Sequence, residues 1–169
     1  THKKGYFASG KFEQFRKNIP FLALIQAIGG LIRYFLTEDE IRLKEIRTKI
    51  SEAVGDNGKV ITDIIPELEL ILGKQKELEA LDNQENQNRF FHVFENFLSS
   101  ITSKEHPLTI FLDDLQWADN STLLLLEKIL TSNSIESLLL IVSYRINEVD
   151  KTHPLYSFML RMEETIEIH

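Results

Sequence analysis

Two short, almost entirely apolar runs constrain the fold of this chain more than any other feature of its sequence. They lie at residues 108–112 and 137–142. Runs of this length and composition are typical of strands that are buried on both faces of a parallel sheet. Between them, residues 119–121 (Asp-Asn-Ser) can cap a helix that extends to Leu130. The pattern therefore predicts a strand–helix–strand unit, and with it an α/β fold.

The amino-terminal part of the chain predicts one more strand and one helix. Residues 6–12 are short and aromatic, which favours a strand. Asn18 can cap a helix that has Pro20 in its first turn. Apolar residues then follow at helical spacing, namely Leu22, Ile25, Ile28, Ile32 and Phe35.

The middle of the chain is predicted to be mainly helical. Thr37 and Glu40 form a capping box that opens a helix toward Ala53, and residues 55–58 break this helix. Further helical stretches are expected at two places, 60–72 (with an interruption near Pro66) and 85–100. The second stretch carries an aromatic stripe that we expect to pack in the core, and the polar residues 73–83 are expected to form an exposed loop.

Composition and charge exclude several classes of protein. The formal net charge is -7 and the basic clusters are short, which argues against a partner that is nucleic acid or an anionic membrane. The chain has no cysteine, which excludes disulfides and thiolate metal sites, and its histidines are scattered without metal-ligand spacing. No apolar run approaches the ~20 residues that cross a bilayer, and residues 1–7 are not expected to be a signal peptide. We therefore expect a cytoplasmic protein without membrane insertion.

The strongest candidates for chemistry are the two acids that end the first apolar run. Asp113 and Asp114 are expected at the carboxyl end of a buried strand, which is where open α/β sheets bind ligands. One carboxylate there can hold a hydrated Mg²⁺, and its neighbour can orient or deprotonate an attacking water. An acidic turn without chemistry is the alternative for residues 110–114 alone, because Asp is common at strand exits.

A longer match gives these acids a context. Residues 112–119 (Leu-Asp-Asp-Leu-Gln-Trp-Ala-Asp), followed by Ser121 and a leucine-rich helix, resemble the Walker B region of large bacterial AAA-type ATPases of the STAND branch of P-loop NTPases. These are switch-like signalling ATPases, and the chain is also similar to those of cyanobacterial multi-sensor hybrid kinases. Supporting similarity extends over most of the chain, at residues 5–14, 18–20, 65–69, 87–90, 144–149 and 153–155.

The resemblance implies roles for individual residues. Asp113 would hold Mg²⁺ through water, and Asp114, which stands where the wider AAA+ group has Glu, would position the attacking water. Arg145 follows the second apolar run, where the nucleotide-sensing strand of the family ends, and could reach a terminal phosphate. A pairing of Arg145 with Glu148 or Asp150 at the strand exit is equally open.

Two neighbours of the acids are explained more simply without a ligand. Asp119 is expected to cap a helix rather than to touch the site. Trp117 is expected to pack a loop rather than to stack on adenine. The alternative functional roles of both residues stay open at this point.

A phosphate-binding loop is expected to lie outside this chain. Residues 5–11 fit seven positions of the Gly-x-x-x-x-Gly-Lys-Ser/Thr pattern, but the eighth is Phe12, which cannot ligate Mg²⁺. In the resembled family this stretch is a strand that follows the true loop. The resemblance thus places the P-loop and the first core strand upstream of Thr1, in agreement with the lack of an initiating Met. One side of the strand at 137–142 would then be bare, and the segment near Ile166 would lack its neighbour.

The sequence therefore predicts a partial P-loop NTPase domain of the ASCE type over residues 1–169, with a parallel sheet that lacks its first strand and a mainly helical insert at 37–103. The parent protein would bind ATP and Mg²⁺ and act as a switch joined to kinase and sensor modules of the same polypeptide, with its oligomeric state open. The isolated chain would bind ATP weakly. The competing hypothesis is a non-enzymatic interaction domain whose acidic strand exit is structural.

Overall fold

A parallel sheet forms one layer of the molecule, as the sequence predicts. The computed structural model describes residues 5–16, 19–79 and 82–165. Its strands are β1 (Tyr6–Lys11), β2 (Leu108–Asp113) and β3 (Leu138–Val142), in the order β1-β2-β3. Both pairings are parallel and in line, with Tyr6 beside Leu108 and Leu108 beside Leu138. All carboxyl ends of these strands therefore lie at the same edge of the layer.

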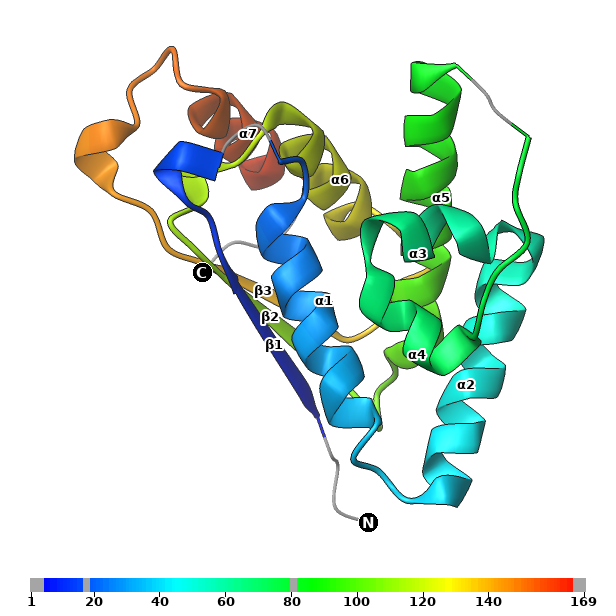
Figure 1. Cartoon of the computed structure of the whole chain (residues 1–169). Coiled ribbons are helices and arrows are strands. Elements are labelled where there is room, and N and C mark those ends of the chain that lie inside the picture. The colour runs from blue at the N-terminus through cyan, green and yellow to red at the C-terminus, as the bar shows by residue number, and fades with distance from the viewer. Residues whose placement is uncertain (1–4, 17–18, 80–81, 166–169) are drawn as a thin grey trace.

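Helices form the second layer. They are α1 (Leu22–Phe35), α2 (Glu40–Val54), α3 (Gly58–Ile64), α4 (Glu69–Leu72), α5 (Asn83–Ile101), α6 (Asn120–Leu130) and α7 (Pro154–Glu163). Short 3₁₀ turns occur at Gln14–Arg16, Gly55–Asn57, Pro66–Leu68, Leu115–Trp117 and Ile146–Glu148. Figure 1 shows α1 to α6 on one side of the sheet, with α1 directly against β1. Most of the chain between β1 and β2 is helical, and the described residues 73–79 form a loop, as expected from their polar sequence.

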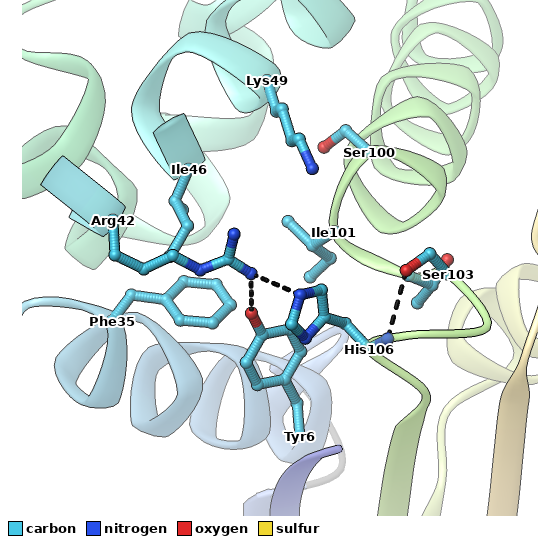
Figure 2. A pocket seen from close by; sticks show the side chains of 10 residues that line it. Tyr6, Phe35, Arg42, Ile46, Lys49, Ser100, Ile101, Ser103 and His106 are labelled. Atoms are coloured by element: carbon cyan, nitrogen blue, oxygen red, sulfur yellow. Dashed lines mark hydrogen bonds between the residues drawn. The ribbon is translucent and has the colours of Figure 1, made fainter. Parts of the chain in front are cut away.

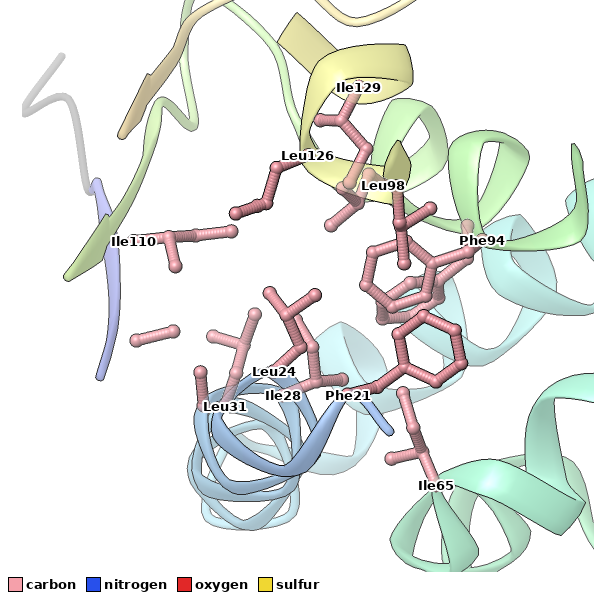
Figure 3. Packing of buried hydrophobic residues seen from close by; sticks show 14 of the residues in the cluster. Phe21, Leu24, Ile28, Leu31, Ile65, Phe94, Leu98, Ile110, Leu126 and Ile129 are labelled. Carbon is pink, nitrogen blue, oxygen red and sulfur yellow. The ribbon is translucent and has the colours of Figure 1, made fainter. Parts of the chain in front are cut away.

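The core fills the space between these layers. Side chains from the sheet (Ile110), α1 (Leu24, Ile28) and α5 (Phe94) point toward one another, together with Leu126 of α6 (Figure 3). Each such side chain, when fully buried, stabilises the fold by about 1.5–3 kcal/mol. The predicted aromatic stripe of α5 lies in this core, with Phe90, Phe91, Phe94 and Phe97 all buried.

Helix starts follow capping chemistry, and one predicted cap is wrong. The side chain of Asp39, not Thr37, caps α2 by accepting a hydrogen bond from the Arg42 backbone N–H at 2.9 Å. The Thr37 hydroxyl instead donates to the carbonyl of Tyr34 at 2.7 Å, so that it ends the preceding helix. A carboxylate competes well for the N-cap because it is both an acceptor and a negative charge near the positive helix end.

The start of α1 also differs from its prediction. The helix begins at Leu22, after Pro20, and Asn18 lies outside the described residues. Phe21 precedes the helix in the left-handed conformation, with φ 62°, and its N–H donates to the Asp119 Oδ2 at 3.2 Å and the Thr122 Oγ1 at 3.1 Å. The first turn of α6 therefore fixes the chain where it enters α1.

The strand β3 is more exposed than a strand buried on both faces, which corrects that prediction. Leu139 and Ile141 are 55% and 43% exposed. They share a sheet face with Phe7, which is also exposed, because paired residues of parallel strands point the same way. Within the described residues β3 is an edge strand, as the expectation of a missing neighbour requires. The predicted strand near Ile166 lies outside the described residues.

A small cavity of about 30 Å³ lies at the opposite, amino end of the strands (Figure 2). Arg42 of α2 donates from Nη2 to the Tyr6 hydroxyl at 2.9 Å, and the same nitrogen lies 2.8 Å from the His106 Nε2. The Tyr6 ring stacks on His106, with centroids 5.5 Å apart. This cluster ties the start of β1 to α2, so we assign it a structural role.

The contact of β1 with α1 depends on Gly10. A Cβ atom added there would lie 1.8 Å from the carbonyl oxygen of Ala23, which is helix backbone and cannot yield. We expect Gly10→Ala to destabilise the protein by about 3 kcal/mol or more, because the helix must move off the strand. Urea unfolding followed by circular dichroism measures this loss.

Gly30 on the outer side of α1 is the matched control. The nearest atom to its added Cβ is the Arg33 Nη2 at 4.0 Å. Gly30→Ala should therefore stabilise the helix by up to about 1 kcal/mol. Equal unfolding midpoints for the two variants would contradict the close-approach argument.

Candidate functional site

The two predicted acids lie together at the carboxyl end of the central strand. Asp113 is the last residue of β2, and Asp114 follows it in the left-handed conformation, with φ 57°. Asp tolerates this conformation better than most residues, but it is uncommon and turns the chain sharply. As a result the two carboxylates converge on one side instead of alternating across the sheet.

Lys11 bridges both carboxylates, and the sequence analysis did not assign it this position. It ends β1 and pairs in register with Asp113. Its Nζ lies 2.8 Å from the Asp113 Oδ2 and 2.9 Å from the Asp114 Oδ2. The alignment of the two parallel strand ends could have revealed it, because residues that end neighbouring parallel strands meet at one edge.

Two further residues that the sequence analysis missed also hold the acids, one at the exit of β3 and one in the turn after β2. The hydroxyl of Ser143, the residue after β3, donates to the Asp113 Oδ1. Gln116 is almost fully buried and donates from Nε2 to the Asp114 Oδ1 at 3.0 Å, and its Oε1 accepts from the Arg145 N–H at 3.3 Å. The amide of Gln116 thus links the exits of β2 and β3.

These contacts keep both acids ionised. The hydrogen bond from Lys11 lowers the pKa of Asp113, with a further contribution from Ser143. Lys11 also lowers the pKa of Asp114, followed by Gln116. The pKa of Lys11 is raised in turn, first by its hydrogen bond to Asp113 and then by that to Asp114. The site therefore presents charged carboxylates at neutral pH, which is the form that binds cations.

Arg145 lies beside the acids and contacts both Glu148 and Asp114. Its Nη1 donates to the Glu148 Oε1 at 3.0 Å, which is one of the two expected strand-exit pairings. Its Nε lies 3.5 Å from the Asp114 Oδ1. Asp150 does not take this role but accepts from the N–H and hydroxyl of Thr152. The structure therefore brings Arg145 and Asp114 together.

The other candidates near the acids have structural surroundings. Asp119 caps α6, with its Oδ1 accepting from the Thr122 N–H at 2.9 Å. Trp117 is half-buried and packs against the core. Both arrangements agree with the structural expectation for these residues.

The loop-like pattern at residues 5–11 is a strand. Tyr6–Lys11 forms β1 in extended conformation, and the Tyr6 N–H donates to the Pro107 carbonyl at 2.7 Å, as expected for pairing with the chain at β2. A phosphate cradle needs free backbone N–H groups that point to one centre. This stretch is therefore not a phosphate loop, as predicted.

The acids fit a hydrated Mg²⁺ in charge and chemistry. Mg²⁺ is usually held by one or two carboxylates and keeps several waters or phosphate oxygens. Across residues 5–16, 19–79 and 82–165, no group of three or more His, Cys, Asp or Glu is arranged to hold a metal.

Within those ranges, no helix has the length and apolar character that a bilayer crossing requires.

Comparison with known proteins assigns the chain to a family. The model of the AAA ATPase domain matches residues 1–142. The chain belongs to this AAA ATPase family. It is also 36% identical over 133 residues to "Hybrid signal transduction histidine kinase G" of Dictyostelium discoideum, a match that covers 79% of this chain and 4% of that protein. The AAA ATPase domain chain thus spans only a small part of that relative, and no solved structure gives a significant match.

The ionisation of the two acids can be tested by titration. We expect the carboxyl ¹³C signals of Asp113 and Asp114 in the wild-type AAA domain to titrate below the ordinary value of 3.8, and Lys11→Met to raise both midpoints. Groups with lowered pKa stabilise the fold above their unfolded pKa, and this contribution disappears as the pH falls through the folded pKa. The stability difference between wild type and Lys11→Met should therefore be largest near neutral pH and shrink below about pH 4.

Lys128→Met provides the control for this titration. Lys128 pairs with Glu95 at 3.3 Å, away from the strand ends, and should leave both midpoints unchanged. Unaltered midpoints in Lys11→Met would contradict the assigned cause.

Proposed function

We propose that this chain supplies the metal-binding and water-orienting half of an ATP-dependent signalling switch. The observation that carries the proposal is the convergence of two ionised carboxylates, Asp113 and Asp114, at the carboxyl end of the central strand. This is where open α/β sheets bind ligands. Membership of the AAA ATPase family supports the nucleotide, and similarity to a protein named as a hybrid signal transduction histidine kinase supports the setting.

Asp113 is the proposed Mg²⁺ ligand, through water. Ser143 and the Asp114 N–H, at 3.1 Å, both donate to its Oδ1, which orients the other oxygen outward. A bound Mg²⁺ would neutralise developing charge on the transferred phosphoryl group. The role of Asp113 would be to hold the Mg²⁺ in a fixed position at the carboxyl end of β2.

Asp114 is the proposed group that orients the attacking water and accepts its proton. Its side chain is only 13% exposed, and Gln116 restrains one of its oxygens. A restrained carboxylate loses little freedom when it aligns a water for attack. Because Asp is one methylene shorter than Glu, the water must lie closer to the β2 exit than it would with Glu.

Arg145 is proposed to contact the terminal phosphate. Its side chain is largely exposed and its planar guanidinium is suited to phosphate oxygens. In the structure Glu148 and Asp114 hold it next to the acids. We infer that it exchanges the Glu148 pairing for the phosphate when nucleotide is bound.

The phosphate cradle is proposed to come from sequence outside residues 1–169, which would form a partial ASCE-type domain with the helical insert at 37–103. The edge position of β3 in the described sheet supports a missing neighbour. Finer features belong to the same proposal: the STAND branch, likeness to cyanobacterial hybrid kinases, a cytoplasmic location, and kinase and sensor modules in the same polypeptide.

A non-enzymatic interaction domain is the competing function. One observation favours it, because Lys11 already neutralises part of the charge on the acids, as a purely structural ion pair would. Substitution of the acids separates the two functions, since a structural pair would affect stability and not turnover.

Asp114→Asn should abolish turnover in a longer form of the protein that includes the upstream sequence. We expect kcat for ATP hydrolysis to fall by about 100-fold or more, because the amide cannot accept the proton.

Asp113→Asn should lower the rate of ATP hydrolysis and raise the Mg²⁺ concentration that gives the half-maximal rate. A coupled phosphate-release assay measures both.

Asp63→Asn is the matched control for these substitutions. Asp63 lies exposed on α3 and pairs with Lys59, so the same chemical change should leave turnover close to wild type. Unchanged turnover in Asp114→Asn would favour the interaction domain.

The 169-residue chain alone should bind ATP weakly. Isothermal titration with ATP and Mg²⁺ is expected to give no saturable heat at micromolar concentrations, because β1 offers no phosphate cradle. The longer form should bind under the same conditions. Tight binding by the short chain that disappears in Lys11→Ala would show that residues 5–11 do bind phosphate.

A further inference from the structure

We propose that Lys11 is a built-in cation that occupies the metal position of the site and must be displaced before a divalent cation can be held, through water, at Asp113 beside Asp114. The inference rests on the proposed function of the two acids, and it adds a residue whose contacts compete directly with the metal. Lys11 would act as a positioning residue and an inhibitory one in the metal-free state.

The argument begins with the use of each carboxylate oxygen. The Asp113 Oδ1 accepts from the Ser143 hydroxyl and the Asp114 N–H. The Asp114 Oδ1 accepts from Gln116 and lies 3.5 Å from the Arg145 Nε. Both Oδ1 atoms are therefore engaged by the fold itself. The Oδ2 atoms are the pair that remains for an external cation.

The Lys11 ammonium takes this remaining pair. Its Nζ contacts the Oδ2 of Asp113 at 2.8 Å and the Oδ2 of Asp114 at 2.9 Å. The ammonium therefore lies between the two carboxylates, in the position that a bound metal ion or its waters would take. A metal or its bound waters would need the same two oxygens, so the two cations exclude each other.

Lys11 is able to leave without disturbing the sheet. Its side chain is 58% exposed, and a lysine ammonium on a flexible stem is readily hydrated. Its backbone stays fixed, since its N–H donates to the Gln26 Oε1 at 3.1 Å and the next N–H, of Phe12, donates to the Asp113 carbonyl at 3.0 Å. Displacement therefore requires only rotation of the side chain into solvent.

Competition of this kind gives the site two states. Without metal, Lys11 balances two like charges that would otherwise repel at the strand exit. With metal, the Asp113 Oδ2 would hold the hydrated divalent cation, the Asp114 Oδ2 would face its bound water, and the ammonium would be free. A divalent ion that binds alone must displace the Lys11 ammonium without compensation. An ion that arrives bound to phosphates gains the contacts of those phosphates with the protein as well.

The test measures binding of Mn²⁺ alone, by electron paramagnetic resonance of the free ion, to the full 169-residue chain. Lys11→Met should bind Mn²⁺ about 10-fold more tightly than wild type, because one competing charge is removed from the site. Lys11→Arg, which keeps the charge, should bind as weakly as wild type. Equal affinity of Lys11→Met and wild type would overturn the proposal.

Two further variants locate the effect. Lys128→Met removes a similarly exposed lysine from its pairing with Glu95 and should leave Mn²⁺ affinity unchanged. Adding Asp113→Asn to Lys11→Met should abolish the gain. A gain that survives the double substitution would place the ion elsewhere and refute the assignment.

A measurement on the wild type keeps the inference testable if Lys11→Met fails to fold. Side-chain ¹⁵N signals of lysines can be followed during titration with Mg²⁺. The Lys11 ammonium signal should move toward that of an exposed lysine while the Lys128 signal stays. Movement of the Asp113 and Asp114 carboxyl signals without that of Lys11 would contradict displacement.

The Mn²⁺ binding measurement and the Mg²⁺ titration contain no nucleotide. Their results can therefore contradict the displacement of Lys11 independently of the proposed ATPase function. A tighter Mn²⁺ site in Lys11→Met together with no ATP turnover in the longer form would support displacement and reject the ATPase. Turnover that depends on Asp114 together with Mn²⁺ binding that ignores Lys11 would do the reverse.

Discussion

The approach of α1 to β1 at Gly10 is the contact on which both the core and the site depend. The strand lies so close to the helix that a methyl group at residue 10 would meet the Ala23 carbonyl. The helix can then cover the sheet with its apolar face. The next residue along the strand is Lys11, whose N–H bonds to Gln26 of the same helix. The packing that forms the core thus also fixes the backbone position of Lys11, whose ammonium reaches the two acids.

Sequence patterns predicted the parts of the fold that follow from local chemistry. The apolar run at 108–112 gave a strand because its length and composition suit a parallel sheet, although one face of β2 is only half-buried. Asp119 capped α6 because a carboxylate is a strong helix cap. The same run placed Asp113 and Asp114 correctly at a strand exit. Their position needed no long-range information, since an acid after a buried strand must emerge at the sheet edge.

What the sequence could not give was set by long-range packing. The run at 137–142 has the composition of a doubly buried strand, but Leu139 and Ile141 face outward because no described helix covers that side. Two partners of the acids, Lys11 and Ser143, come from other strand exits that are far away in sequence, and only the register of the parallel strands brings them to the acids. Gln116 is a local partner, two residues after Asp114. Thr37 failed as a cap because Asp39, two residues on, is the better acceptor.

The geometry of the acids argues against a purely structural ion pair. A structural pair at a strand exit requires one carboxylate and one cation, and exposed pairs of this kind contribute little stability. Here the chain takes a left-handed turn at Asp114, at some conformational cost, and thereby directs two carboxylates at one point. Gln116 is buried in order to restrain the second of them. Two carboxylates directed at one point suit a divalent cation better than a single ammonium, which supports the proposed role of the site.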